Sequence, residues 1–326
     1  MTVLCGGLGG ARLALAAVEG GTASSTTFVT NVADDWDVGG LPVCPDTDAV
    51  LYALSGRFDT DRGWEVRGDV FPGPRHGEPS WFGIGDLDRA THQRRRSLLE
   101  SGATLADATD ALAAAAGAVA RVIPATDHPV RTRIRTSTGW NGFQEWLVRD
   151  RAPHVDEVRW VGLTEATASR GVVDAVDQAD LVVIASSSPI ASLAPILGIA
   201  EIRGALERRS RHSTRPTLAL SPVVIGRPPT TERDRHREAA RVRLPRSVGI
   251  EHTHVAIARW LAPLVSHFAV DPSDASWSDD VAETGVIPVL APVIGADVEE
   301  RRDLVALFDS MAQGAARRSA SMHPVP

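Results

Sequence analysis

The chain opens with Thr2-Val-Leu-Cys-Gly-Gly-Leu-Gly-Gly-Ala-Arg12, a short apolar run that leads into a glycine-rich turn. This stretch predicts a strand over residues 2–5, a turn, and a helix over residues 11–18. A second strand is expected at residues 26–30, and Asp46 or Thr47 is a suitable cap for a helix ending near Leu54. Strand, loop, helix and strand in this order open a parallel α/β sheet.

The remainder of the chain extends the same pattern around an irregular middle. Residues 57–150 are expected to form an inserted subdomain with helices at 87–100 and 105–120. Its β-hairpin has strands at 130–136 and 143–148 around a turn at 138–142. Further strands are expected at 180–184, 217–220, 268–270 and 286–290, and helices at 253–264 and 297–311. The prediction is one doubly wound, Rossmann-like, mostly parallel α/β domain over residues 1–315, with fraying from residue 312 and a flexible tail at 316–326.

Composition narrows the class of protein. The 326 residues carry 43% hydrophobic side chains and a formal net charge of −7, which fits a globular protein and argues against a general nucleic-acid binder. No run approaches the ~18 apolar residues of a membrane helix, and the start lacks a secretory pattern. Two cysteines fit a reducing, cytoplasmic setting. The chain contains no lysine, so Schiff-base and P-loop lysine chemistry are excluded.

In a doubly wound sheet the ligand lies at the carboxyl ends of the strands, so the loops after the predicted strands form the expected site. The glycines after residue 5 allow backbone amides to approach a phosphate, and Arg12 lies one helical turn further on. The glycine spacing is neither that of a dinucleotide fingerprint nor that of a Walker loop. Small polar residues also follow two later strands, at Ser187, Ser188 and Ser221.

Five aspartates cluster after the second strand and at the start of the next helix, at positions 34, 35, 37, 46 and 48. Clustered carboxylates repel one another unless a cation is bound, which favours a Mg²⁺ site. Helix capping by Asp46 and turn formation by Asp34 and Asp35 remain alternative interpretations. The arginines 131, 133 and 135 share one strand face, and a solvated face is favoured over a ligand patch.

Two further stretches, Pro45-Asp-Thr-Asp48 and Gly85-Asp-Leu-Asp-Arg-Ala-Thr-His92, occur in this order and at a specific spacing. With the glycine loop, they make residues 2–225 resemble the 2-phospho-L-lactate transferases of coenzyme F-420 biosynthesis, in particular the actinobacterial phosphoenolpyruvate transferase branch. The resemblance implies transfer of a phospholactyl or phosphoenolpyruvyl group from a guanosine diphosphate-linked donor to the ribityl hydroxyl of the deazaflavin Fo, with release of GMP. It also implies Mg²⁺ as cofactor and a cytoplasmic homodimer that binds small molecules rather than nucleic acid or membrane.

The resemblance gives each candidate residue an expected role. Asp48 and Arg89 are expected to be catalytic and to bind the acceptor together with His92. Asp34, Asp35 and Asp46 are the expected metal ligands. The donor and its phosphates are expected to contact Gly6, Gly7, Gly9, Gly10, Arg12, Asn31, Ser187, Ser188 and Ser221. Replacing Asp48 by asparagine is expected to reduce turnover far more than folding.

Departures from the family pattern fall mostly on the donor side, at Leu8, Ser188 and residues 226–231. The main alternative is the related nucleotide-sugar-binding regulatory family, which shares the Gly-Gly start and the Val-Ala-Asp-Asp element at residues 32–35. A nicotinamide oxidoreductase is disfavoured by the glycine spacing, and nothing indicates a pure assembly protein. The choice among lactyl, enolpyruvyl and glyceryl donors stays open.

Overall fold

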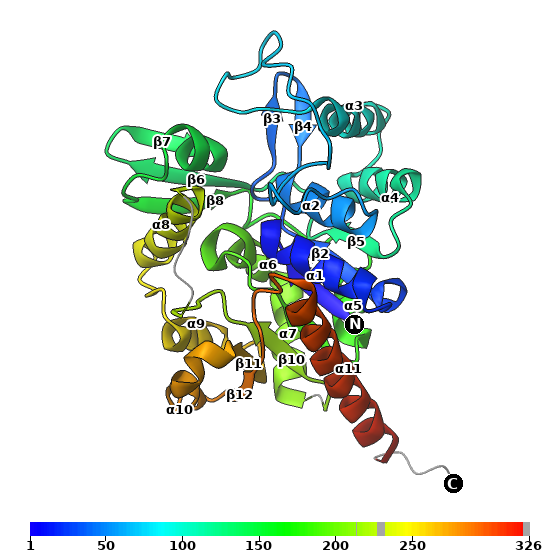
Figure 1. Ribbon diagram of the computed structural model, residues 1–326, viewed down its shortest axis with the longest axis vertical. Coiled ribbons are helices and arrows are strands. Elements are labelled where there is room, and N and C mark those ends of the chain that lie inside the picture. The colour runs from blue at the N-terminus through cyan, green and yellow to red at the C-terminus, as the bar shows by residue number, and fades with distance from the viewer. Residues whose placement is uncertain (213, 227–231, 322–326) are drawn as a thin grey trace.

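The computed structural model describes residues 1–212, 214–226 and 232–321 and is built around a seven-stranded sheet (Figure 1). All neighbouring strands in this sheet are parallel, in the order β12-β11-β10-β9-β1-β2-β5. The strands are β1 (Thr2–Cys5), β2 (Thr27–Thr30), β5 (Arg121–Pro124), β9 (Val182–Ile184), β10 (Thr217–Leu220), β11 (His267–Val270) and β12 (Ile287–Leu290). The predicted parallel α/β fold is confirmed.

The central strands are apolar on both faces because helices cover both sides of the sheet. Leu4, Val29 and Ile184 point into one core layer. Their sequence neighbours Val3, Phe28 and Val183 point into the other. This alternation explains why the strands read as continuous apolar runs.

One layer of helices packs against the face that carries Val3, and a second against the face that carries Leu4. The first layer contains α1 (Gly7–Glu19), α2 (Pro45–Leu54), α4 (Leu105–Ala116) and α11 (Val298–Ser321). The second contains α5 (Val172–Gln178), α6 (Ala194–Gly198), α7 (Ala200–His212), α9 (His254–Leu261) and α10 (Ser278–Ala282). Figure 1 shows α11 lying along α1, so the two ends of the described chain share one layer.

Two smaller antiparallel sheets stand beyond the carboxyl edge of the large one. The β3–β4 hairpin (Trp36–Val38 and Leu41–Val43) contacts α3 (Asp86–Glu100). The second sheet has the order β7-β6-β8, from β7 (Gly139–Gly142), β6 (Arg131–Thr136) and β8 (Glu157–Val161). The remaining helix, α8 (Glu232–Ser247), contacts β8. These parts overhang the edge at which the site was expected (Figure 1).

Several predicted boundaries were wrong. The expected hairpin turn at residues 138–142 is largely strand β7, and the expected return strand at 143–148 is mostly a π-helical turn, Glu145–Arg149. Strand β5 lies inside the expected insertion but pairs with β2 in the main sheet. Helix α1 begins at Gly7 rather than Ala11. The start was predicted too late because the first turn contains glycines, which ordinarily disfavour a helix. Residues 312–321, expected to fray, continue α11.

Among the described residues no single helix is long and apolar enough to cross a membrane. Two consecutive segments, Pro189–Gly198 and Ala200–Arg211, reach that length only together and meet at 88°. Their apolar side chains are part of the buried core, for example Ile196, Leu197 and Ile202.

Candidate active site

The loops after β1, β2 and β9 meet at the point where strand order reverses, since β1 lies between β9 and β2. The Gly6 amide donates to Ser187 Oγ at 3.1 Å, and Ser187 Oγ donates back to the Gly6 carbonyl at 2.8 Å. Asn31 Nδ2 donates to Ala191 O at 3.3 Å. The sheet edge therefore brings the predicted donor-side loops together, as the topology of the fold requires.

The glycine loop contacts Asp46, the second residue of α2. Asn31 Nδ2 donates to Asp46 Oδ2 at 2.9 Å, and the same carboxylate accepts from the Ser192 hydroxyl and the Gly7 amide. A Cβ on Gly6 would lie 2.2 Å from Asp46 Oδ2, so only glycine allows this approach. The Asp46 carboxylate thus accepts a hydrogen bond from the Gly7 amide, which was predicted to bind phosphate. Burial raises the pKa of Asp46 to about 6.

The other predicted donor residues also have contacts within the protein. Gly9 and Gly10 allow close packing, because an added Cβ would lie 2.8 Å from Ser186 O and from Cys5 Sγ, respectively. The Cβ of Arg12 lies 3.9 Å from the position of a Cβ on Gly295, in the loop before α11. Ser188 Oγ accepts from the Ala191 amide at 3.3 Å and caps the π-helical turn Pro189–Leu193. Of the departures at residues 226–231, those at 227–231 lie outside the described residues.

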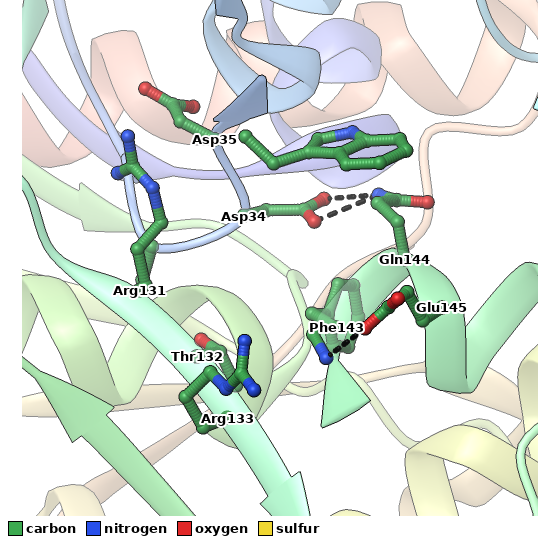
Figure 2. A pocket seen from close by; sticks show the side chains of 11 residues that line it. Asp34, Asp35, Arg131, Thr132, Arg133, Phe143, Gln144 and Glu145 are labelled. Atoms are coloured by element: carbon green, nitrogen blue, oxygen red, sulfur yellow. Dashed lines mark hydrogen bonds between the residues drawn. The ribbon is translucent and has the colours of Figure 1, made fainter. Parts of the chain in front are cut away.

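A cavity of about 250 Å³ lies between the loop after β2 and the β6–β7 ribbon (Figure 2). It is lined by Ala33, Asp34, Asp35, Trp36, Arg131, Thr132, Arg133, Gly142, Phe143, Gln144 and Glu145. Gln144 Nε2 donates to both Asp34 oxygens at 2.8 Å and fixes the orientation of that carboxylate. Glu145 accepts from the Gly142 amide at 2.6 Å. Two of the predicted metal ligands, Asp34 and Asp35, therefore line the same cavity, but Figure 2 shows the Asp34 carboxylate turned toward Gln144 and the Asp35 carboxylate turned away from it.

Burial of the Asp34 and Asp35 carboxylates destabilises their ionised form. Burial, followed by the charge of Asp46, raises the pKa of Asp34 well above its usual range. Burial raises the pKa of Asp35 to about 8, although the Arg131 guanidinium and a hydrogen bond from Cys44 oppose the shift. Asp35 Oδ1 is buried without a hydrogen-bond partner. A divalent cation at this oxygen would stabilise the ionised carboxylate, and carboxylate oxygens are the ligands that Mg²⁺ prefers.

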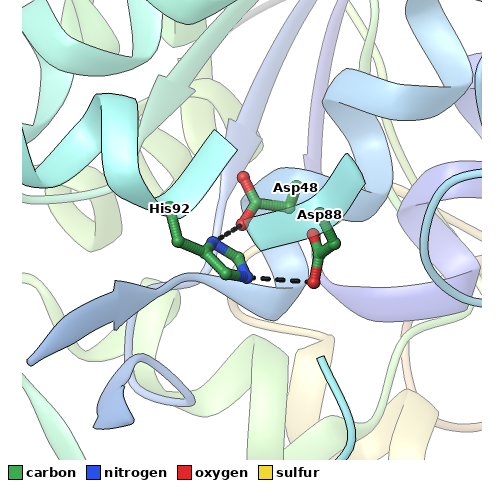
Figure 3. A group of neighbouring side chains, drawn as sticks. All are labelled: Asp48, Asp88 and His92. Atoms are coloured by element: carbon green, nitrogen blue, oxygen red, sulfur yellow. Dashed lines mark hydrogen bonds and ion pairs between the residues drawn. The ribbon is translucent and has the colours of Figure 1, made fainter. Parts of the chain in front are cut away.

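Asp48 lies in a second cluster, with Asp88 and His92, none of which lines the cavity (Figure 3). Its carboxylate is paired with the fully buried guanidinium of Arg95. His92 Nδ1 lies 3.6 Å from Asp48 Oδ2 and accepts from Arg95 Nη1 at 3.2 Å, so Nε2 carries the proton donated to Asp88 Oδ2 at 2.9 Å. The Tyr52 hydroxyl donates to Asp88 Oδ1 at 2.6 Å.

This cluster also has metal-ligating chemistry, but its ligand atoms are already engaged. Within the described part of the chain, Asp48, Asp88 and His92 are the residues whose potential ligand atoms all lie within 4.8 Å of one another. Arg95, Tyr52 and the His92 ring satisfy the carboxylates, so a cation would have to displace protein partners. The orphaned oxygen of Asp35 makes the cavity the better fit for Mg²⁺.

Arg89 is also paired, with Glu78 from the loop before α3. Both side chains are buried, and Arg89 Nη2 donates to Glu78 Oε2 at 3.0 Å. The hydrogen bond from Arg89 holds the pKa of Glu78 below its usual range. Arg89 Nε is buried without a partner. The expected acceptor residues Asp48, Arg89 and His92 therefore share α2 and α3, but each has a protein partner.

Ser221, after β10, belongs to a buried chain of three polar side chains. Ser221 Oγ lies 2.9 Å from His254 Nδ1, and His254 Nε2 lies 3.1 Å from Asp274 Oδ2. The Ile225 amide also donates to Asp274 Oδ2, at 2.8 Å, so the chain fixes the loop after Ser221. Burial holds the pKa of His254 below its usual value, although Asp274 opposes the shift.

The sequence missed three groups that the structure brings to the site: Arg133 and Gln144 at the cavity, and Arg95 beside Asp48. Gln144 is 110 positions from its partner Asp34, so no local spacing indicates the contact. Arg95 stands in a run of three arginines on an exposed-looking helix, and it is buried where the helix meets Pro42 of the β3–β4 hairpin and Asp48 of α2. The alternation at residues 131–135 did indicate that Arg133 projects from one face of a strand, but that face was predicted to be exposed to solvent.

Comparison with known proteins places the chain among phosphate-group transferases. A model of the family described as 2-phospho-L-lactate transferase CofD matches residues 1–251. A phosphoenolpyruvate transferase of Mycolicibacterium smegmatis is 33% identical, over 94% of this chain and 96% of the relative. A protein of the same name from Streptomyces griseus is 32% identical, over 92% and 94%.

Solved structures agree on the fold. A crystal structure of a Bacillus halodurans protein superposes with a TM-score of 0.56 at 17% identity, over 89% of this chain and 91% of that one. A second structure of the same Bacillus halodurans protein, described as a member of the UPF0052 family, gives a TM-score of 0.54 at 17% identity over the same shares.

Proposed function

This chain belongs to the CofD family of 2-phospho-L-lactate transferases and is a transferase enzyme, and from this premise we propose its reaction. It moves a phospholactyl or phosphoenolpyruvyl group from a guanosine diphosphate-linked donor to the terminal ribityl hydroxyl of the deazaflavin Fo. The bond between phosphorus and the GMP oxygen breaks, a bond to the ribityl oxygen forms, and the hydroxyl proton is lost. GMP and a phosphodiester are the products.

The observation that carries this proposal is a cavity whose lining includes both buried carboxylates and arginines. Phosphoryl transfer depends mainly on positioning and on neutralising negative charge. Asp34 and Asp35 would hold Mg²⁺, which when bound neutralises charge on the transferred phosphoryl group. Gln144 fixes the Asp34 carboxylate, and Arg131 sets positive charge beside both carboxylates. Asp46, the third expected ligand, holds the adjoining glycine loop in place.

The donor is bound by the loops that follow the strands at the carboxyl edge of the sheet. Gly6, Gly7, Gly9, Gly10, Arg12, Asn31, Ser187, Ser188 and Ser221 are the proposed donor contacts. Except for Ser221, which follows the neighbouring strand β10, support comes from their position at or beside the point of strand-order reversal, where α/β enzymes bind nucleotides. Because the Gly7 amide already contacts Asp46, donor phosphates have to bind beside that carboxylate or displace it.

On the acceptor side, Asp48 and Arg89 are the proposed catalytic residues, with His92 as a further acceptor contact. Arg89 can bind the acceptor only by exchanging its Glu78 partner for acceptor oxygens. Asp48 orients the attacking hydroxyl, and the ion pair with Arg95 fixes the position of its carboxylate. A cytoplasmic homodimer that acts on these small molecules completes the proposal.

The proposal is tested by incubating the purified protein with Fo, Mg²⁺ and each candidate guanosine diphosphate-linked donor. The expected result is an Fo phosphodiester and an equal amount of GMP, both lost when EDTA is added. Binding of a nucleotide sugar with no binding of Fo would support the regulatory alternative instead. Size-exclusion chromatography with light scattering tests the dimer separately.

A further inference from the structure

Three arginines project from the same face of β6, and only two of them have partners. Arg131 Nη1 donates to the Val130 carbonyl at 2.7 Å, and Arg135 Nη2 lies 3.1 Å from Glu157 Oε2. Arg133, between them, lines the cavity and is half buried. Within the described residues, its guanidinium makes no hydrogen bond or ion pair.

Two other residues that line the cavity each have a buried side-chain oxygen that the protein leaves unsatisfied. Thr132 Oγ1 and Asp35 Oδ1 both lack a hydrogen-bond partner, although the two residues are at least nine-tenths buried. Buried polar groups in folded proteins are nearly always hydrogen-bonded, so these two oxygens are exceptions in the wall of the cavity that Arg133 lines. Figure 2 shows Arg133 and Thr132 on one strand, with the Asp34 carboxylate held by Gln144 on a different segment.

The charges divide the cavity into an acidic part and a basic part. Asp34 and Asp35 repel an anion unless a cation intervenes, so the phosphate belongs there only together with Mg²⁺. Arg133 is an open site for a second anionic group that needs no metal. The transferred three-carbon acid has such a group, its carboxylate, on the carbon next to the phosphate ester.

Resting on the proposed function, we propose that Arg133 binds the carboxylate of the transferred three-carbon acid and determines specificity for acidic donors. The planar guanidinium matches a carboxylate through two parallel hydrogen bonds, which lysine cannot reproduce. The cavity, at about 250 Å³, is smaller than the ~300–1,000 Å³ of pockets for drug-sized ligands. It accommodates the three-carbon group, while the guanosine and the deazaflavin lie outside it.

The test compares two donors on four proteins. One donor is guanosine diphosphate-linked lactate, and the other has a neutral carboxamide in place of the carboxylate. The proteins are the wild type, Arg133→Ala, Arg133→Lys and the control Arg135→Ala, which removes an arginine from the same strand face outside the cavity. Each is assayed with Fo and Mg²⁺, and kcat and KM are determined separately for each donor.

For Arg133→Ala, kcat/KM with the carboxylate donor is expected to fall about 10- to 100-fold, mainly through KM, as for a lost charge-assisted hydrogen bond. With the carboxamide donor the change should stay within about threefold, and Arg135→Ala should stay within about threefold on both donors. Arg133→Lys should lie between the alanine variant and the wild type.

An equal loss on both donors would overturn the proposal, because Arg133 would then act on the phosphate or on the shape of the cavity. Equal use of the two donors by the wild type would also overturn it, while leaving the proposed transfer reaction intact. No turnover by the wild type with any guanosine diphosphate-linked donor would overturn the proposed function, and this inference with it.

Discussion

Replacing Asp48 by asparagine removes one half of a buried ion pair and leaves the other half without compensation. Arg95 is fully buried and paired with Asp48, and its Nη1 also donates to the Pro42 carbonyl at 3.1 Å. Breaking a buried pair from one side typically costs about 3–5 kcal/mol, because the remaining charge stays desolvated. A domain is stable by only ~5–15 kcal/mol. The structure therefore revises the expectation that this change spares folding: both stability and turnover should fall.

Thermal unfolding followed by circular dichroism measures the effect. For a chain of this size, 3–5 kcal/mol corresponds to a fall in Tm of about 4–7 °C. Turnover of the variant should be measured well below its own Tm, so that the loss of activity reports the acceptor contact rather than unfolding. The double variant Asp48→Asn with Arg95→Met should regain part of the lost stability, since apolar replacement of a buried pair is often tolerated.

Asp86→Asn provides the matched control. Asp86 lies in the first turn of α3 and pairs with Arg75 at 3.0 Å, but both side chains are about half exposed. Such a pair contributes less than about 1 kcal/mol, so its loss should move the Tm by no more than ~2 °C. If both asparagine variants melted at the same temperature as the wild type, the buried Asp48–Arg95 pair would not stabilise the fold as described.

Three more changes have definite expected outcomes. Glu78→Gln weakens the partner of Arg89 and should lower the Kd for Fo in a fluorescence titration; weaker binding would show that Glu78 supports the acceptor site rather than competing with it. Gly6→Ala places a methyl group 2.2 Å from Asp46 Oδ2 and should abolish donor binding measured by calorimetry, whereas normal binding would contradict the described glycine loop. The pKa of His254 is lowered by burial, so its neutral form contributes stability that is present above the ordinary pKa of about 6.5 and is lost as pH falls through the folded value. His254→Gln should therefore flatten the decline in Tm below pH 6.5, and an unchanged decline would exclude His254 as its source.

The sequence was sufficient for features set by local pattern. The glycine turn after β1 and the buried runs of β9 and β10 indicated a parallel sheet, and the sheet then implied which loops meet. Strand β5 was missed because only four residues, directly after an alanine-rich helix, form it. The hairpin return was misplaced because Thr138-Gly-Trp-Asn-Gly142 contains two glycines typical of turns, yet the chain reverses just before it and these residues mostly pair with β6.

The site was harder to predict because its contacts join distant positions. Asp46 was open to two interpretations, and in the structure its carboxylate accepts from the Gly7 amide across the sheet edge. The partner of Arg89 comes from Glu78, in a glycine- and proline-rich loop without periodic pattern. Whether Arg133 faces solvent or a cavity depends on the loop carrying Asp34, about a hundred residues earlier. Residue types alone hold none of this information.

The central claim is that this chain transfers a phosphate-linked three-carbon acid to a deazaflavin alcohol. The most direct measurement is mass spectrometry of the products formed from Fo, Mg²⁺ and guanosine diphosphate-linked lactate or enolpyruvate. The wild type is compared with Asp34→Asn, which removes the charge of a proposed Mg²⁺ ligand. The wild type should form an Fo phosphodiester and GMP in equal amounts, and the variant should form far less of both. Absence of the phosphodiester with every donor, while Fo and the donors remain intact, would contradict it.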